Sequence, residues 1–411
     1  MFHILYILLL CCGISLPFLR MRLEDVAFPF LFIKIKRPKV PRYLALFLGY
    51  ALFSTLLHIC QNGSPSAALF EWGVFAYCGL LFIAFQRQFA SPKSLWQIGA
   101  TIIIAAFACW LIDLLRYIAS PESQPFFSMI SEKMSETAMP FLARRFQFLF
   151  NNPNMFGNVL ALPFLLIALP FCTETPSLGK RYLIATFCLI PAVFIPLAFT
   201  FSKHAILSFA ILCAFLSCQI KLPRKAKYLA LLPIVIAGLF LETTVLFTTF
   251  PLKSDTPFIN TTPGMYTIHQ KAYAKIICSK FNMFGFHPAK TRELYIANVD
   301  KESARITLRH YNSENDLETF TTFMDPHCEY LNIPFLFGFP AFVLLIAFLV
   351  NLCRTTQTPL LATCLVTALL FSMLWDDILS KRAIWIMLSL LTIYKKGENN
   401  GESSIADGQR I

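Results

Sequence analysis

Long apolar runs separated by short polar connectors make up most of this 411-residue chain. Most runs approach the 17 to 25 or so residues that a helix needs to cross the hydrocarbon core of a bilayer. They predict spans at 2–19, 43–60, 67–86, 95–118, 155–172, 182–201, 204–220, 228–247, 333–352, 359–374 and 383–394. The segment 23–33 is short and carries Glu24 and Asp25, so we expect a partial span or a re-entrant piece. With it the count is twelve, which predicts an all-α polytopic membrane protein.

The polar stretches divide the chain into four regions. Residues 1–247 hold the first nine helices and an outer loop at 119–153, and residues 248–332 form a large, partly helical outer loop. Residues 333–394 hold the last three helices. The tail 395–411 has the polar composition of a disordered terminus.

The distribution of charge along the chain indicates how the spans are oriented in the membrane and does not by itself indicate a nucleic-acid partner. Apolar residues make up 56% of the chain and charged residues 14%, with a net charge of +12. In a soluble protein that charge would suggest nucleic acid, but here Lys and Arg gather in the connectors between spans. One set of alternate connectors holds seventeen of them, and the short loops and span ends of the other set hold nine, so the first set is expected to be cytoplasmic. Both termini are then cytoplasmic, and both longer loops are outside.

The cysteines and the absent motifs restrict the chemistry. Most of the 13 cysteines lie within apolar runs, and no CxxC pair or zinc-like spacing occurs. Cys278 and Cys328, in the large loop, could form a disulfide if that loop is extracytoplasmic. No nucleotide-binding or metalloenzyme motif is present, so no cofactor is expected.

Basic residues at the outer ends of spans oppose the orientation rule, which raises the question of what anion each one meets. Lys203 lies in a short break between two spans, and Arg145 precedes the turn Asn152-Pro153-Asn154. Each can be an anchor at lipid headgroups or a ligand of phosphate. For Lys203, backbone N–H groups at the start of the next helix would assist a diphosphate.

The large loop holds further candidates. Residues 264–288 read as an amphipathic helix that lies on the protein or membrane surface, with His269 in its apolar arc and Lys271 on the opposite face. If the loop closes over a cleft, these two are its cations. His327 lies at the outer membrane boundary, where a neutral imidazole could accept a proton or could simply be interfacial.

Acidic residues surround these candidates. Asp325 and Glu329 could orient His327 or act as rival bases. Between the last two spans, Asp376 and Asp377 with Lys381 and Arg382 are expected to form a self-paired charged turn. The sequence alone leaves each of these readings open.

Two stretches in the first half of the chain resemble the O-antigen ligase family of bacterial membrane glycosyltransferases. Residues 145–154 are similar to its R-x-x-G-x-x-x-N-P-N element, with Phe148 in place of the glycine. Thr200 to Ala205, TFSKHA, is similar to T-x-S-R-G-A, with Lys203 replacing arginine and His204 replacing glycine. Positive charge is kept, but the bidentate geometry of arginine is lost.

Two stretches in the second half continue the resemblance. Phe284-Gly285-Phe286 is similar to a G-V-G turn that follows a helix in the family. That family helix usually starts with an arginine. In this chain the cations nearest to the position of that arginine are His269 and Lys271. His327-x-x-Tyr330-Leu331, with Gly338 eleven residues after the histidine, is similar to H-N-x-Y-L and its glycine.

The resemblance implies a GT-C-like enzyme of the bacterial inner membrane whose active site faces the periplasm. It would move a glycan from undecaprenyl diphosphate to an acceptor sugar hydroxyl, commonly on lipid A-core, without metal or nucleotide. His327 would be the base, and Lys203, Arg145 and one of His269 or Lys271 would hold the diphosphate. Asp325, Glu329 and Tyr330 would support His327.

Three other functions stay open at this point. A polymerase of the same family would extend the glycan on its lipid carrier, and a protein oligosaccharyltransferase shares the histidine-loop pattern. A transporter or flippase would show similar spans and charge bias. Because the sequence shows no clear internal repeat and its charges gather at the outer boundary, we favour the enzyme.

Overall fold

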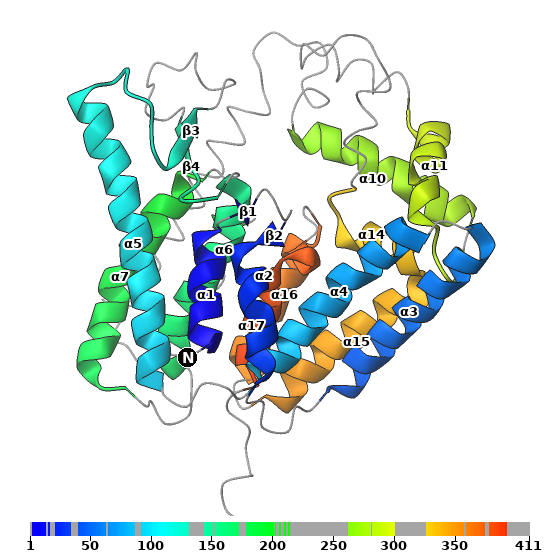
Figure 1. Ribbon diagram of the computed structural model, residues 1–411, viewed down its shortest axis with the longest axis horizontal. Helices are drawn as coiled ribbons and strands as arrows, with labels where there is room; N and C mark the ends of the chain where they lie inside the picture. The colour runs from blue at the N-terminus through cyan, green and yellow to red at the C-terminus, as the bar shows by residue number, and fades with distance from the viewer. Residues whose placement is uncertain are drawn as a thin grey trace, which may run out of the picture.

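The computed structural model of the chain is a bundle of α-helices with two very short sheets (Figure 1). It describes residues 2–13, 15–16, 21–33, 40–62, 65–86, 92–130, 144–150, 153–171, 178–200, 202, 205–206, 209–210, 213, 262–280, 282–300, 326–356, 359–374 and 378–392. Most of these residues lie in helices.

Four of the described helices are long and apolar enough to cross a membrane: α3 (Arg42–Asn62), α4 (Pro65–Phe85), α5 (Pro92–Ala119) and α7 (Lys180–Ala198). Each covers one of the predicted spans with small shifts at its ends. At 28 residues α5 is about 42 Å long, more than the hydrocarbon core requires. The protein is therefore helical and of membrane type, as the sequence predicts. The finer prediction of twelve spans is not decided by these four helices.

The remaining described helices are shorter. They are α1 (Phe2–Cys12), α2 (Leu23–Ala27), α6 (Pro153–Ala168), α10 (Thr262–Ser279), α11 (Thr291–Asn298), α14 (Glu329–Phe337), α15 (Phe339–Thr355), α16 (Pro359–Ser372) and α17 (Arg382–Leu390). Four 3-10 turns accompany them: η2 (Phe28–Phe32), η5 (Leu169–Phe171), η6 (Pro288–Lys290) and η8 (Ile378–Ser380). The predicted spans at 204–220 and 228–247 lie largely or wholly outside the described residues.

Two of the predicted spans differ in the structure. The expected helix at 2–19 ends at Cys12, before Gly13, and α1 then packs beside α2. The expected helix at 333–352 is two helices, α14 and α15, which meet at Gly338 with φ 88°. Hydropathy runs unbroken across that glycine, so the apolar pattern does not reveal the break.

The two sheets are antiparallel pairs: β1 (Ser15–Leu16) with β2 (Met21–Arg22), and β3 (Ser128–Ile130) with β4 (Arg144–Phe146). In Figure 1, β3, β4, α10 and α11 all lie at one end of the helical bundle. We call this the loop end.

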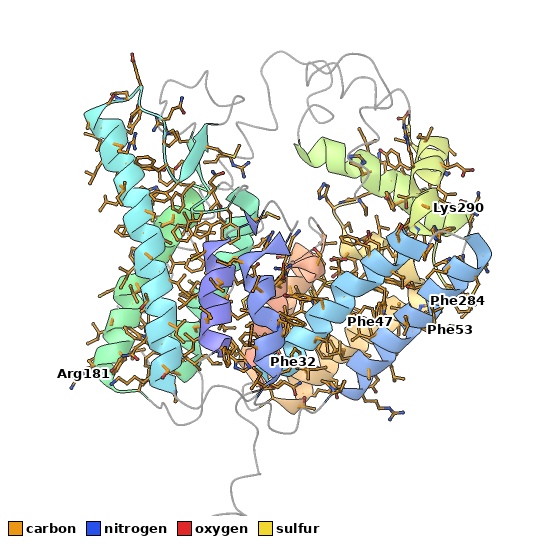
Figure 2. The ribbon with its side chains drawn as sticks, in the orientation of Figure 1. Phe32, Phe47, Phe53, Arg181, Phe284 and Lys290 are labelled. Carbon is orange, nitrogen blue, oxygen red and sulfur yellow. The ribbon has the colours of Figure 1, made fainter. Side chains whose placement is uncertain are left out.

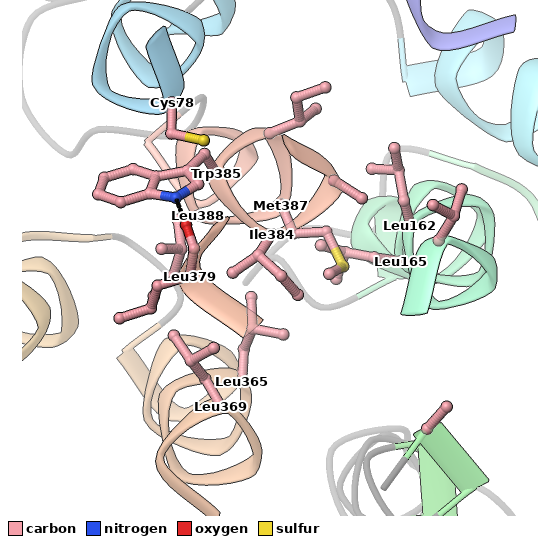
Figure 3. Close-up of a cluster of buried hydrophobic side chains, with 14 of the residues drawn as sticks. Cys78, Leu162, Leu165, Leu365, Leu369, Leu379, Ile384, Trp385, Met387 and Leu388 are labelled. Atoms are coloured by element: carbon pink, nitrogen blue, oxygen red, sulfur yellow. Dashed lines mark hydrogen bonds between the residues drawn. The ribbon is translucent and has the colours of Figure 1, made fainter. Parts of the chain in front are cut away.

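The apolar core runs through the bundle, and α17 lies near its middle (Figure 3). Trp385 is fully buried, and its indole N–H donates to the Leu379 carbonyl at 2.6 Å. Around it, side chains of α17 (Ile384, Met387 and Leu388) pack with side chains from α4 (Cys78), α6 (Leu162 and Leu165) and α16 (Leu365 and Leu369). The final helix therefore ties the first half of the chain to the second.

Candidate functional site

The first two stretches of the family resemblance are in direct contact. Arg145, in β4, donates from Nε and Nη2 to the Thr200 carbonyl at 3.0 and 2.8 Å. The neighbouring Phe146 amide donates to the Phe199 carbonyl at 2.8 Å. The planar guanidinium thus holds the backbone that leads into the TFSKHA turn. Lys203 itself lies outside the described residues.

Phe148 occupies the position at which the family pattern has glycine. Its φ is 55°, in the left-handed region that L side chains rarely adopt and that glycine enters without cost. The ring is 7% exposed and lies 5.4 Å from that of Phe156 in α6, centroid to centroid. The backbone here has the conformation that the family's glycine would favour, although the side chain differs.

Asp113, a buried acidic residue in α5, holds the segment that leads to β3. Its carboxylate accepts from the Phe126 and Phe127 amides, each at 2.9 Å, and from the Ser128 hydroxyl at 2.7 Å. Since β3 pairs with β4, and Met129 lies opposite Arg145, Asp113 supports the strand that carries this arginine. Sequence reasoning missed it. A single carboxylate within the apolar run 95–118 was the available signal.

The helix expected at 264–288 is α10, which ends earlier, at Ser279, and its buried and exposed faces are as predicted. His269 is fully buried and Lys271 is exposed. The Nδ1 of His269 is 2.9 Å from the Tyr295 hydroxyl of α11. Burial, and to a smaller extent the electrostatic interaction with His327, lowers the pKa of His269 to about 4. His269 is therefore neutral near pH 7, and the predicted roles of His269 and Lys271 at the diphosphate stay predictions.

The turn after α10 is held by one face of α3. The Tyr50 hydroxyl donates to the Met283 carbonyl at 2.8 Å. The Phe284 carbonyl accepts from the Ser54 hydroxyl and lies 2.9 Å from Nε2 of His58. Figure 2 shows Phe284 next to Phe53 at this end of α3.

These three α3 residues are a second omission of the sequence reasoning. Tyr50, Ser54 and His58 are four residues apart, so they share one face of the predicted span. That spacing of polar side chains in an apolar helix was the signal that could have found them.

The third and fourth stretches of the resemblance also meet directly. The Phe286 amide donates to the Phe335 carbonyl at 2.6 Å. At Gly338, with φ 88°, an added Cβ would lie 1.6 Å from the Met283 oxygen. At Gly285, with φ 74°, it would lie 2.6 Å from the Phe335 oxygen. Both glycines are thus required by backbone conformation and by the close approach of the other segment.

His327 lies beside these contacts, just before α14. It is half-buried, and its φ of 45° is a left-handed conformation that L residues rarely adopt. His327 interacts electrostatically with His269, so the structure brings these two predicted residues near each other. Such strained positions concentrate at functional sites.

The predicted supporting residues have structural partners. Glu329 is fully buried, and its Oε1 accepts from the Leu379 amide at 3.0 Å. The Tyr330 hydroxyl donates to the Leu370 carbonyl at 2.9 Å. Glu329 thus anchors the start of α14 to η8, and Tyr330 anchors it to α16. Asp325 lies outside the described residues.

A disulfide and a metal site were also considered from the sequence. Cys278 is exposed and Cys328 is buried, and both are free thiols, so the disulfide considered from the sequence is not formed here. In the described part of the chain, no group of three or more histidine, cysteine or acidic side chains is placed to hold a metal ion.

Comparisons with known proteins do not add a relative. No family model, no curated protein and no solved structure matches the chain.

Proposed function

We propose that this chain is a membrane glycosyltransferase of the O-antigen ligase type. It would move a glycan from undecaprenyl diphosphate to a sugar hydroxyl, with lipid A-core as the expected acceptor. In this proposal the chain has twelve spans in the bacterial inner membrane, with both termini in the cytoplasm and the loop end in the periplasm. The four helices of spanning character are compatible with it.

One observation carries the proposal: the four stretches that resemble the family form two contacting pairs. The Arg145 stretch contacts the Thr200 turn, and the Phe284 turn contacts the stretch from His327 to Gly338. These partners are separated by about 50 residues in the chain, so local sequence similarity does not require them to meet. Phe148 and Gly338, both at glycine positions of the family pattern, have positive φ.

The proposed mechanism is a single displacement at the anomeric carbon. Neutral His327 would accept the proton of the acceptor hydroxyl as its oxygen forms a bond to that carbon. The bond between the carbon and the diphosphate oxygen would break with inversion, and undecaprenyl diphosphate would leave with the electron pair. Lys203, Arg145 and Lys271 would supply positive charge to the diphosphate.

His269 has a different place in this mechanism from the one the sequence suggested. Because its imidazole is buried and neutral, it would adjoin His327 without adding charge. Tyr295, hydrogen-bonded to its Nδ1, would fix its orientation. The cation of the large loop is then Lys271.

Reconstitution tests the proposal. The purified chain is placed in vesicles with undecaprenyl-diphosphate glycan and either lipid A-core or additional carrier-linked glycan. Glycosylated core is the expected product. Elongated carrier-linked glycan would instead identify a polymerase. Movement of the lipid-linked glycan across the membrane without any new glycosidic bond would identify a flippase and overturn the proposal.

A further inference from the structure

A cavity of about 450 Å³ lies between α1, α4, α6 and the start of α17. Its basic wall consists of Arg22, Lys381 and Arg382, and Asn158 of α6 adds an amide. Its apolar wall includes Phe70 and Val74. The cavity adjoins the first stretch of the family resemblance, because Phe150 and Met155 also line it. None of its three cations has a role in the proposed transfer reaction.

Arg382 is held in place by buried carboxylates. Its Nη1 is 2.7 Å from Oε1 of Glu24, and its Nη2 is 2.9 Å from Oδ1 of Asp25. The Tyr77 hydroxyl donates to the same Asp25 oxygen at 2.8 Å. These two partners of Arg382 lie more than 350 residues away in the chain. Asp376 and Asp377 lie outside the described residues.

The carboxylates lie behind the cations. Neither Glu24 nor Asp25 lines the cavity, and Glu24 is fully buried. Among the described residues, the lining of the cavity therefore includes three basic side chains and no acidic one. A ligand of opposite charge fits this wall.

Two contacts of the Arg22 guanidinium with described side chains are long. Its Nη2 is 3.7 Å from the Met155 thioether, and its Nη1 is 3.8 Å from Oε1 of Glu24. A thioether is a poor acceptor, and 3.8 Å is long for an ion pair. A phosphate oxygen would satisfy this planar fork far better than either partner.

The apolar wall determines the kind of anion. Phe70 lines the cavity and is 69% exposed, so the apolar wall continues onto the outer surface of α4. In a helix of spanning character such a surface faces lipid. The cavity thus joins a basic corner to a lipid-facing wall, which suits a molecule with an anionic head and a hydrocarbon chain.

We propose that this cavity binds a membrane lipid that carries a phosphate, with Arg22 as the direct phosphate ligand. Lys381 and Asn158 complete the polar corner, and the first part of the lipid chain lies along Phe70 and Val74. Arg382, fixed by Glu24 and Asp25, adds positive potential. The proposal does not rest on the transfer reaction, because binding is measured without any glycan.

The test is a titration of the purified full chain in neutral detergent, followed by native mass spectrometry. The probes are dioctanoyl phosphatidic acid, dioctanoylglycerol and inorganic phosphate. We expect one phosphatidic acid to bind, and Arg22→Gln to weaken it about tenfold through loss of a charge-assisted hydrogen bond. Arg354→Gln, at an exposed arginine outside the cavity, is the matched control and should leave the affinity unchanged.

A second pair of variants changes the volume of the cavity and leaves its charge unchanged. Gly73 lines the cavity and Gly49 does not, and a Cβ added at either meets no atom within 4 Å. Gly73→Leu should therefore fill the cavity and abolish binding without unfolding the helix, whereas Gly49→Leu should bind as the wild type does.

Three results would overturn the proposal. Unchanged affinity in both Arg22→Gln and Gly73→Leu would exclude this cavity. Equal binding of dioctanoylglycerol would show that the phosphate is not recognised. Equal affinity for inorganic phosphate would show an anion site without a lipid component.

Discussion

Replacing Gly338 by alanine perturbs the contact between the Phe284 turn and the junction of α14 with α15. The added methyl group would lie 1.6 Å from the Met283 oxygen and 2.3 Å from its carbonyl carbon. Both atoms belong to the backbone, so no side-chain rotation relieves the overlap. The turn must move away from Gly338.

The loss in the free energy of unfolding can be estimated from the hydrogen bonds that this movement breaks. The lost hydrogen bonds are those from the Phe286 amide to the Phe335 carbonyl, from the Tyr50 hydroxyl to the Met283 carbonyl and between His58 and the Phe284 carbonyl. At about 1 kcal/mol each, these give about 3 kcal/mol. A φ of 88° adds about 1 to 3 kcal/mol for an L residue.

Scanning fluorimetry of the solubilised chain measures the loss. A destabilisation of this size lowers the unfolding temperature by roughly 5 °C. Hydrogen exchange should also rise locally at residues 282–290, because that segment is released before the bundle opens. Gly49→Ala is the control, since its Cβ meets nothing within 4 Å and it should be neutral or slightly stabilising. Wild-type stability and wild-type exchange in Gly338→Ala would refute the proposed steric conflict.

Three further predictions concern Asp113, His269 and Lys203. Asp113→Ala should destabilise the chain by about 3 kcal/mol, measured by thermal unfolding, because three donors lose a buried charged acceptor; an unfolding temperature equal to the wild type's would contradict this. His269 has a pKa of about 4 when folded and an ordinary value of 6.5, so the folded state resists its protonation. Stability should be complete above pH 6.5 and fall as the pH drops towards 4, and His269→Gln should flatten that part of a stability profile. Lys203→Ala should weaken binding of the donor diphosphate about tenfold, measured with a labelled donor, and Lys203→Arg should restore it; equal affinities in all three proteins would remove Lys203 from the site.

The long helices were predictable because a bilayer imposes both length and composition. The expected spans 43–60, 67–86, 95–118 and 182–201 correspond to α3, α4, α5 and α7 within a few residues. The amphipathic helix of the large loop was predictable from its period, with His269 buried and Lys271 exposed. The local pattern of apolar and polar residues determines such helices.

The contacts between distant segments were not predictable from local pattern. Nothing near Arg382 in the sequence indicates that its guanidinium meets Glu24 and Asp25, because packing of whole helices brings them together. The break at Gly338 depends likewise on the approach of Met283 from another segment. Motif spacing could nominate His327 and Arg145, but only the fold shows what each one contacts.

The burial of His269 shows how its environment changes what residue type alone suggests. It is a candidate phosphate ligand because it is one of the cations nearest to the position of the family's loop arginine. Enclosed by apolar side chains and next to His327, its imidazole has a pKa of about 4 and carries no charge near pH 7. Environment, which a single sequence does not specify, decides the protonation state.

The release of undecaprenyl diphosphate by the purified chain is the decisive measurement for the proposed transfer reaction. Vesicles contain undecaprenyl-diphosphate glycan and lipid A-core, and the freed carrier is measured over time for the wild type and for His327→Ala. We predict release coupled one for one to glycosylated core in the wild type. In the variant we predict release at least about a hundredfold slower, as for loss of a general base. Equal rates in the two proteins would contradict the role of His327, and no release by the folded wild type with core or with carrier-linked acceptor would contradict the proposed function itself.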